Sequence, residues 1–215
     1  VELLLSKNVP AGNIVLSVSL PATYDERLNG LLNRGVRITG VKSDDIDEAL
    51  RLVKGGDFLF VYWVGHGVQN AEGRYLLTAD STNKELRGIK AETIVSKCRS
   101  REFAQTQAFF FDCCAQPTNS LAKAVMLNGL DPVSRIQHCY YAASSGEFAV
   151  ADKSRPGFTS TVIAQLRDGE FFPPDVDSLI LSLQNRLKAL AESGELRTRP
   201  VALDFSSDPL TGWSK

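Results

Sequence analysis

The sequence predicts an α/β fold with a mostly parallel central sheet of about six strands and helices on both faces. Short runs rich in β-branched and aromatic residues recur along the 215-residue chain. Amphipathic segments, whose apolar residues have helical spacing, separate these runs. Such alternation is typical of layered α/β proteins, in which crossover helices cover both faces of a parallel sheet.

Five elements are predicted in the first third of the chain. In order, they are a strand at 13–20, a helix at 24–32, a strand at 36–41, a helix at 44–53 and a strand at 58–64. β-branched residues mark the strands, and Gly35 ends the first helix. From Ile46, the apolar residues of the second helix follow the i, i+3, i+4, i+7 pattern, and acidic residues at its start favour the helix dipole.

The remaining predicted elements continue the alternation. They are a small hairpin that includes 75–78, a helix at 91–98, strands at 108–112 and 138–144, helices at 158–166 and 176–190, and a strand at 200–205. The apolar side of the 176–190 helix favours packing on the sheet over binding a partner. One or two helical turns are predicted at 121–127, within an otherwise polar loop.

Length and composition predict one globular domain over residues 1–215. The 24 basic and 25 acidic residues nearly balance, so neither nucleic acid nor a membrane is an expected partner. No apolar stretch reaches the ~18 residues that span a bilayer, and the first residues lack a secretory pattern. We therefore expect a cytoplasmic protein with reduced cysteines. Because Val1 is the first residue and Met126 the only methionine, we also expect a fragment or processed part of a longer protein.

Two apolar strands each end near a reactive side chain. The 58–64 strand precedes His66, and the 108–112 strand precedes Cys114, which lies 48 positions after His66. The carboxyl ends of parallel strands meet at one edge of a sheet, and this separation accommodates the crossover between them. A histidine beside a cysteine indicates acyl transfer, because the imidazole can withdraw the thiol proton and later give a proton to the departing amine. The amides of Gly67 and Cys114 are candidate donors to an oxyanion.

Other interpretations of these residues compete with catalysis. A histidine after an apolar strand, or a single cysteine, is often only an interior residue, and the combination of the two favours a functional site. Adjacent strand residues point to opposite faces, so Cys113 and Cys114 cannot both face His66, and parity does not choose between them. A zinc site built from Cys113, Cys114, Cys139 and a histidine is disfavoured, because no Cys-x-x-Cys knuckle is present.

The motifs around these residues resemble those of the caspase and metacaspase superfamily. Tyr62-Trp-Val-Gly-His-Gly67 resembles its His-Gly signature, and Phe110-Phe-Asp-Cys-Cys114 resembles its Asp-x-Cys signature. The segments Tyr140–Ala149 and Gly157–Ser160 are similar to the strand and helix that follow the nucleophile in bacterial caspase-like peptidases. The resemblance covers most of the chain and implies a caspase-like sandwich.

This resemblance identifies Cys114 as the nucleophile and His66 as its partner in a cysteine endopeptidase. We expect no cofactor and no metal ligands, and the sequence leaves open whether calcium switches the enzyme on. Metacaspases carry a similar carboxylate two places before the nucleophile and cleave after Arg or Lys, so Asp112 implies a basic residue before the scissile bond. Hydrogen bonding of Asp112 to local backbone amides is the alternative. In caspase-like folds the region of Ser144 and Ser145 lines the substrate cleft, where their hydroxyls or backbone would pair with an extended peptide as in strand addition. A plain turn at these serines is the alternative.

The sequence also departs from the metacaspase pattern. Ala115-Gln-Pro117 replaces the His-Ser-Gly that often follows the nucleophile, and the caspase Gln-Ala-Cys-Arg-Gly block is absent, so specificity for aspartate is not carried over. The closer likeness to bacterial members implies a role in defence or programmed cell death. We expect a protein or peptide substrate, and a regulatory domain or partner protein is compatible with the resemblance. A non-catalytic caspase-like interaction module is the alternative function.

Overall fold

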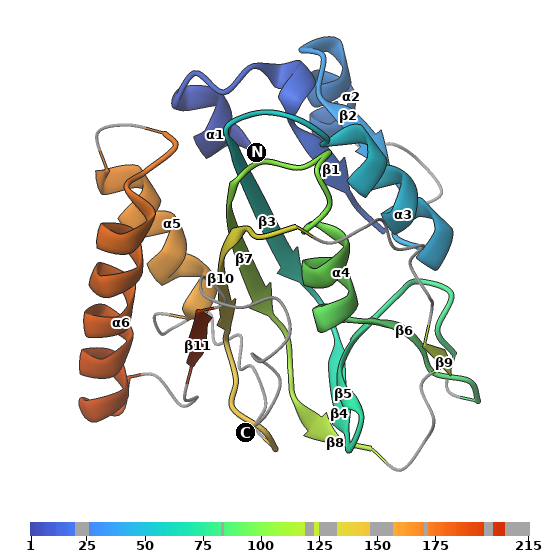
Figure 1. The fold of residues 1–215 in the computed structure, drawn as a ribbon, viewed down its shortest axis with the longest axis vertical. Coiled ribbons are helices and arrows are strands. Elements are labelled where there is room, and N and C mark those ends of the chain that lie inside the picture. The colour runs from blue at the N-terminus through green and yellow to red at the C-terminus, as the bar shows by residue number, and fades with distance from the viewer. Residues whose placement is uncertain are drawn as a thin grey trace.

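The computed structural model describes residues 1–19, 26–82, 84–118, 123–124, 133–146, 157–169, 172–195 and 200–204. Figure 1 shows how the elements are arranged. In chain order they are α1 (Glu2–Ser6), the 3-10 helix η1 (Ala11–Asn13), β1 (Val15–Ser17), α2 (Glu26–Asn33), β2 (Arg37–Thr39), α3 (Ser43–Leu52), β3 (Phe58–Val64), β4 (Gly67–Asn70), β5 (Gly73–Leu77), β6 (Arg87–Lys90), α4 (Ala91–Lys97), β7 (Thr106–Asp112), β8 (Gln116–Pro117), β9 (Lys123–Ala124), β10 (Ile136–Tyr141), α5 (Phe158–Asp168), α6 (Val176–Glu192) and β11 (Val201–Asp204).

Four strands form the main sheet, in the order β11-β10-β7-β3. β3, β7 and β10 run parallel, and β11 joins β10 in the antiparallel direction. The interior strand β7 is buried from Gln107 to Phe111, as expected for a parallel strand covered on both faces. The ladder between β3 and β7 begins with Phe58 opposite Thr106 and ends with Val64 opposite Asp112.

The two faces of this sheet carry separate apolar clusters, with helices over each (Figure 1). Along β7, Ala108 and Phe110 pack with α5 and α6, whereas Phe109 and Phe111 pack with α3 and α4. Alternation of side chains along a strand explains this division. The buried side of α6 consists of Val176, Leu179, Leu183, Leu187 and Leu190. The predicted packing of this helix on the sheet is confirmed.

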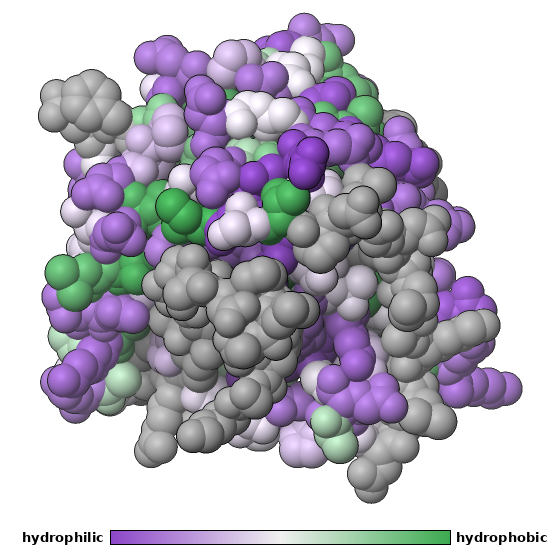
Figure 2. All heavy atoms as spheres, viewed as in Figure 1, coloured by the Kyte–Doolittle hydropathy of each residue, from purple (hydrophilic) through white to green (hydrophobic). Residues whose placement is uncertain are grey.

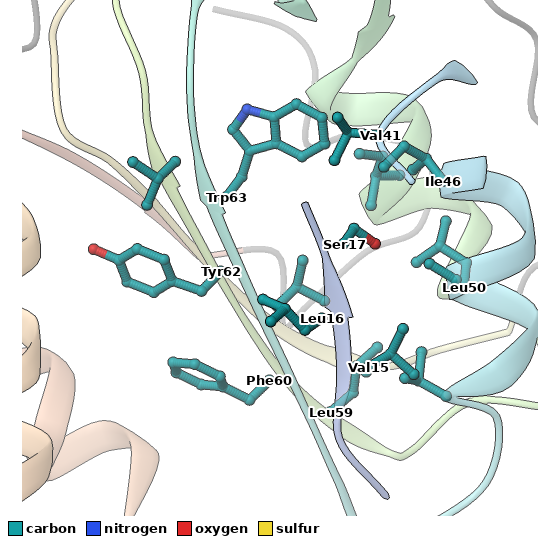
Figure 3. A pocket seen from close by; sticks show the side chains of 15 residues that line it. Val15, Leu16, Ser17, Val41, Ile46, Leu50, Leu59, Phe60, Tyr62 and Trp63 are labelled. Carbon is teal, nitrogen blue, oxygen red and sulfur yellow. The ribbon is translucent and has the colours of Figure 1, made fainter. Parts of the chain in front are cut away.

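β1 and β2 form a separate parallel pair. The six expected strands are thus present but divided into groups of two and four, and no backbone hydrogen bond joins β1 to β3 within the described residues. Apolar side chains of β1, β3 and α3 line a cavity between the two strands instead (Figure 3). β1 is also shorter than the predicted 13–20 strand, because only Val15–Ser17 pair with β2 and Asn13 belongs to η1.

A second sheet, in the order β8-β4-β5-β6-β9, follows the carboxyl ends of β3 and β7 (Figure 1). β4, β5 and β6 are antiparallel, and β8 and β9 add in parallel to its two outer members. The prediction of helical turns at 121–127 is wrong for Lys123–Ala124, because these two residues pair with Arg87 and Gly88 as strand β9. The rest of 121–127 lies outside the described residues.

The other predicted elements occur in the expected order with shifted ends. The strands predicted at 108–112 and 138–144 are β7 and β10, which begin two residues earlier than expected. Residue 20 of the first predicted strand, residues 24–25 of the first predicted helix and residue 205 of the last predicted strand lie outside the described residues. The sequence does not predict α1, η1, β6 or β8, which are short and lack strong periodicity.

Hydrophilic side chains cover most of the described surface in the view of Figure 2. Hydrophobic residues form small, separate groups on this face. Large hydrophobic side chains that are exposed belong to Leu32, Val64, Ile136, Ile163 and Leu181. Among the described helices, none is long and apolar enough to cross a membrane.

Candidate active site

His66 and Cys114 lie between two parallel ladders that have the same register. The β3–β7 ladder ends just before them, and the β4–β8 ladder begins just after them. The flanking pairs are Val64 with Asp112 and Val68 with Gln116. In both pairs the partners are 48 positions apart, which is also the separation of His66 and Cys114. Because adjacent strands are about 4.8 Å apart, the backbones of His66 and Cys114 run side by side.

Backbone hydrogen bonds hold the turn that carries His66. The amide of Gly65 donates to the carbonyl of Asp112 at 3.2 Å, which extends the β3–β7 ladder. The amide of Leu77 donates to the carbonyl of His66 at 2.9 Å, which joins the turn to β5. The turn is therefore fixed from both sides, while His66 itself is exposed to solvent.

A chain of side-chain hydrogen bonds identifies the sheet face on which the candidate residues lie. The hydroxyl of Tyr62 donates to Thr159 of α5 at 2.9 Å, and the Thr159 hydroxyl donates to the carboxylate of Asp112. Burial raises the pKa of Tyr62 above its ordinary value, so this hydroxyl stays protonated. Tyr62 and Asp112 thus share the α5 face. Continued by four residues from Tyr62 and by two residues from Asp112, the alternation assigns His66 and Cys114 to the same face.

Cys113 belongs to the opposite face of the sheet. It is 4% exposed and packs within the cluster that α3 and α4 cover. Burial raises the pKa of the Cys113 thiol to about 12, so very little thiolate forms near neutral pH. Cys114, by contrast, is half-buried. The structure therefore distinguishes two cysteines that strand parity in the sequence leaves equivalent.

Gly67 lies in close backbone contact with the two cysteines. A Cβ at this position would stand 2.5 Å from the carbonyl oxygen of Cys114 and 2.9 Å from the sulfur of Cys113. Both distances are too short for nonbonded atoms, so glycine is required. Because the carbonyl of His66 accepts a hydrogen bond from the amide of Leu77, ladder alternation directs the Gly67 amide away from β5 and toward the cysteines. The Cys114 atom nearest to the added Cβ is its carbonyl oxygen.

The chain after β10 runs beside the segment that follows the candidate nucleophile. The amide of Gly146 donates to the carbonyl of Ala115 at 2.9 Å, and the side chain of Gln116 donates to the carbonyl of Gly146 at 3.3 Å. Ser144 is half-buried and Ser145 is exposed, directly before Gly146. Both serines therefore lie at the same edge of the sheet as the two cysteines.

Sequence reasoning does not identify Arg74 or Thr159 as part of this region. The Arg74 guanidinium donates to the carbonyl of Ala143 at 2.7 Å and lies 4.4 Å above the ring of Tyr141. It thereby ties β5 to the loop that carries the two serines. Its partners are more than sixty positions away, so no local pattern marks it. Thr159 lies within the Gly157–Ser160 motif, which gives its location in the fold but not its contacts.

The described residues contain no group of three His, Cys, Asp or Glu side chains that would hold a metal ion. All four cysteines are free thiols. His138 is buried in β10, with its Nε2 atom 3.8 Å from the carboxylate of Asp177 on α6. These positions give no support to a zinc site that joins Cys113, Cys114 and Cys139 to a histidine.

The likeness of this chain to known proteins lies in its fold and not in its sequence. Neither a family model nor a curated protein matches the sequence. Caspase-1 from Spodoptera frugiperda is a similar solved structure, with a TM-score of 0.54 at 13% identity. The alignment covers 88% of this chain and 83% of that one. This likeness confirms the predicted fold class, and we conclude that the chain has a caspase-like α/β fold.

Proposed function

We propose that this protein is a cysteine endopeptidase of the caspase-like type, with Cys114 as the nucleophile and His66 as its proton acceptor and donor. The observation that carries the proposal is the common register of the ladders on either side of this pair. It keeps the two backbones adjacent, and strand alternation assigns both side chains to the α5 face. The caspase-like fold agrees with this chemistry.

In the proposed reaction the sulfur of Cys114 attacks the carbonyl carbon of the peptide, and His66 takes up the thiol proton. His66 then gives this proton to the departing amine, which leaves a thioester on Cys114. Water attacks the thioester with His66 as the base, and the acid product and free thiol are released. The amide of Gly67, directed toward the cysteines, supports a role as oxyanion donor together with the amide of Cys114.

We further propose that the peptide binds with a basic side chain near Asp112 and its backbone beside Ser144 and Ser145. The hydrogen bond from Thr159 fixes the Asp112 carboxylate on the face assigned to Cys114. The donor to Asp112 is a side-chain hydroxyl of α5 and not a local backbone amide. This favours the interpretation that the Asp112 carboxylate is positioned to bind a basic side chain of the substrate. A fixed carboxylate attracts Lys or Arg through charge-assisted hydrogen bonds.

The catalytic assignment is tested with a peptide library that varies the residue before the scissile bond. Cys114→Ala is expected to reduce cleavage to the uncatalysed background, because the covalent step is lost. His66→Ala is expected to lower kcat about 100- to 10,000-fold, the range of general acid–base catalysis. Circular dichroism of each variant verifies that the fold is retained.

Cys113→Ala serves as the matched control, since it removes the neighbouring thiol from the opposite face. Its cleavage rate is expected to remain close to that of the wild type, because the raised pKa of Cys113 makes it a poor nucleophile. Full activity of Cys114→Ala, combined with loss in a folded Cys113→Ala, would reverse the assignment. No cleavage by the wild type and no His66-dependent labelling of Cys114 by a thiol-reactive peptide would favour the interaction module.

Specificity is tested separately with Asp112→Asn, which keeps the shape of the side chain and removes its charge. The preference for Arg over Gln before the scissile bond is expected to fall by about 10- to 150-fold, the equivalent of one charge-assisted hydrogen bond of about 1.5–3 kcal/mol. Turnover of a substrate with Gln should change little. An unchanged preference would remove Asp112 from the specificity pocket.

The proposal extends to a role in bacterial defence or programmed cell death, in the cytoplasm. This part rests on the motif resemblance around His66 and Cys114. Expression of the wild type in bacteria, compared with Cys114→Ala, tests it. Growth arrest that depends on the thiol supports the role, and equal growth of both strains argues against it.

A further inference from the structure

Ser144 and Ser145 lie between two residues that hydrogen bonds hold in place. Before them, the carbonyl of Ala143 accepts a hydrogen bond of 2.7 Å from Nη1 of Arg74. After them, Gly146 bonds to the chain that directly follows the candidate nucleophile, through its amide at 2.9 Å and its carbonyl at 3.3 Å. The Arg74 bond therefore fixes the start of residues 143–146, which we call the serine segment.

The Arg74 guanidinium is itself held in one position. Its Cζ atom lies 4.4 Å from the centre of the Tyr141 ring, and this ring stacks on Phe111 at 5.1 Å. Tyr141 is only 3% exposed, so its ring has little room to move. At the backbone, Arg74 pairs with Gln69 in the ladder between β4 and β5. A planar group that stacks on a fixed ring holds its N–H donors in a fixed direction.

Strand β5 contacts the candidate site in two places. The amide of Leu77 donates to the carbonyl of His66 at 2.9 Å, and the side chain of Arg74 donates to Ala143. Arg74 and Ala143 are 69 positions apart, so only the folded chain brings them together. One short strand thereby sets the position of the serine segment relative to the proposed base.

The contact of Arg74 with the serine segment depends on geometry and not on charge pairing. Within the described part of the chain Arg74 forms no ion pair, and its hydrogen bond goes to a neutral carbonyl. A neighbouring carboxylate belongs to Glu92 of α4, where burial raises the pKa of Glu92 and the positive charge of Arg74 opposes this rise. Lysine at position 74 would keep this charge, but it lacks the planar group that stacks on Tyr141 and directs a donor. Substitution can therefore separate the two effects.

We propose that Arg74 is a positioning residue for the substrate, because it holds the serine segment in the conformation to which an extended peptide binds. This inference rests on the proposed function, in which the peptide backbone lies beside Ser144 and Ser145. Arg74 contacts this segment and not the reacting atoms. Its loss therefore weakens the binding of peptides that reach the segment and leaves the chemistry of Cys114 unchanged.

The test compares two substrates with the same leaving group, the coumarylamides of acetyl-Val-Ala-Ala-Arg and of acetyl-Arg. The longer substrate presents three further residues to the serine segment. In Arg74→Ala, KM for the longer substrate is expected to rise about 10- to 150-fold, the equivalent of one hydrogen bond to a charged group. Its kcat should change little, because the same binding is lost in the ground state and in the transition state. KM for the shorter substrate should change much less.

Two further measurements separate positioning from a general loss of structure. Arg74→Lys should lose nearly as much as Arg74→Ala, because the charge alone does not direct the donor. Ethylguanidinium, at a concentration that does not denature the chain, should restore a low KM to Arg74→Ala, because this ion fits the space above Tyr141. Persistence of the high KM with ethylguanidinium, or a wild-type KM in Arg74→Lys, would overturn a role that depends on the planar group.

Arg87→Ala is the matched control, because Arg87 is the other arginine in the described strands of the second sheet. Its side chain pairs with Asp80 and Glu85. Both KM values of this variant should remain close to those of the wild type. The rate at which iodoacetamide alkylates Cys114, followed by mass mapping, should be equal in the wild type, Arg74→Ala and Arg87→Ala.

Binding is also measured without catalysis. The Kd of the longer peptide is compared between Cys114→Ala and the same chain with Arg74→Ala added, which should raise Kd about 10- to 150-fold. This rise, together with a wild type that cleaves neither substrate, would refute the proposed peptidase and leave the role of Arg74 standing. Equal Kd values, or no binding to either chain, would overturn that role. Equal losses on the two substrates, or slower alkylation of Cys114 in Arg74→Ala, would overturn it as well.

Discussion

Replacing Gly67 with alanine tests the packing between the turn that carries His66 and the cysteine segment. The new Cβ would stand 2.5 Å from the carbonyl oxygen of Cys114, whereas ordinary contact begins at 3.4 Å. The two backbones must therefore separate by about 0.9 Å, the difference between these distances. Overpacking of a tight contact costs about 1–3 kcal/mol of stability, and a misplacement of about 1 Å between reacting groups lowers the rate about 100-fold.

Two measurements check this expectation for Gly67→Ala. Urea denaturation gives the loss of unfolding free energy, and peptide cleavage gives kcat/KM. Gly30→Ala is the control, because a Cβ at Gly30 in α2 meets no atom within 4 Å and alanine favours the helix by about 1 kcal/mol. Wild-type stability of Gly67→Ala would refute the close contact. Reduced stability with unchanged kcat/KM would show that the contact does not position the catalytic pair.

Three further expectations follow from burial and hydrogen bonding. In a urea titration, Leu183→Ala, which truncates a fully buried side chain of α6, should lower the unfolding free energy by about 2–5 kcal/mol. The control Leu181→Ala changes a position that is 59% exposed, and it should change the unfolding free energy by less than about 0.5 kcal/mol. Thr159→Val removes the hydroxyl that links β3 and β7 to α5 and should cost about 1–3 kcal/mol; a neutral effect on the urea midpoint would contradict the network. At pH 8, iodoacetamide should modify Cys114 before Cys113, because a pKa raised from 9.0 to about 12 lowers the thiolate fraction of Cys113 about 1000-fold. Mass mapping that finds the two cysteines modified at equal rates would refute this expectation. Above about pH 9 the unfolded chain ionises this thiol while the folded protein keeps it protonated, so stability should fall between pH 9 and pH 12.

Much of the fold follows from local patterns in the sequence. The continuous apolar run Ala108–Phe111 of β7 predicts a strand buried on both faces, and its residues do divide between two helix-covered clusters. The apolar spacing from Val176 to Leu190 predicts the face of α6 that packs on the sheet. These properties depend on neighbours within a few positions, so the sequence displays them directly.

The short elements of the second sheet are not predictable in this way. β8 and β9 contain two residues each and form only because β4 and β6 offer free edges. The expected helical turns at 121–127 give way to β9 for the same reason. Pairing between distant segments overrides weak local preference in such short pieces.

For the candidate site, the sequence places His66 and Cys114 after two strands but leaves the choice between Cys113 and Cys114 to family resemblance. The structure adds physical differences between the two cysteines, because burial closes off Cys113 and leaves Cys114 half-exposed. It also reveals the anchoring of Asp112 by a helix residue 47 positions away. A one-dimensional pattern carries no information on such contacts.

By itself, then, the sequence determined which segments are strands or helices, which side of each is apolar, and which reactive residues follow the strands. Only the tertiary structure decided the common register that brings the backbones of His66 and Cys114 side by side, the contact that requires glycine at position 67, and the cavity between β1 and β3. The reason is physical: secondary structure and amphipathicity arise from interactions between near neighbours, whereas register, close packing and unpaired edges depend on segments that meet only when the chain has folded.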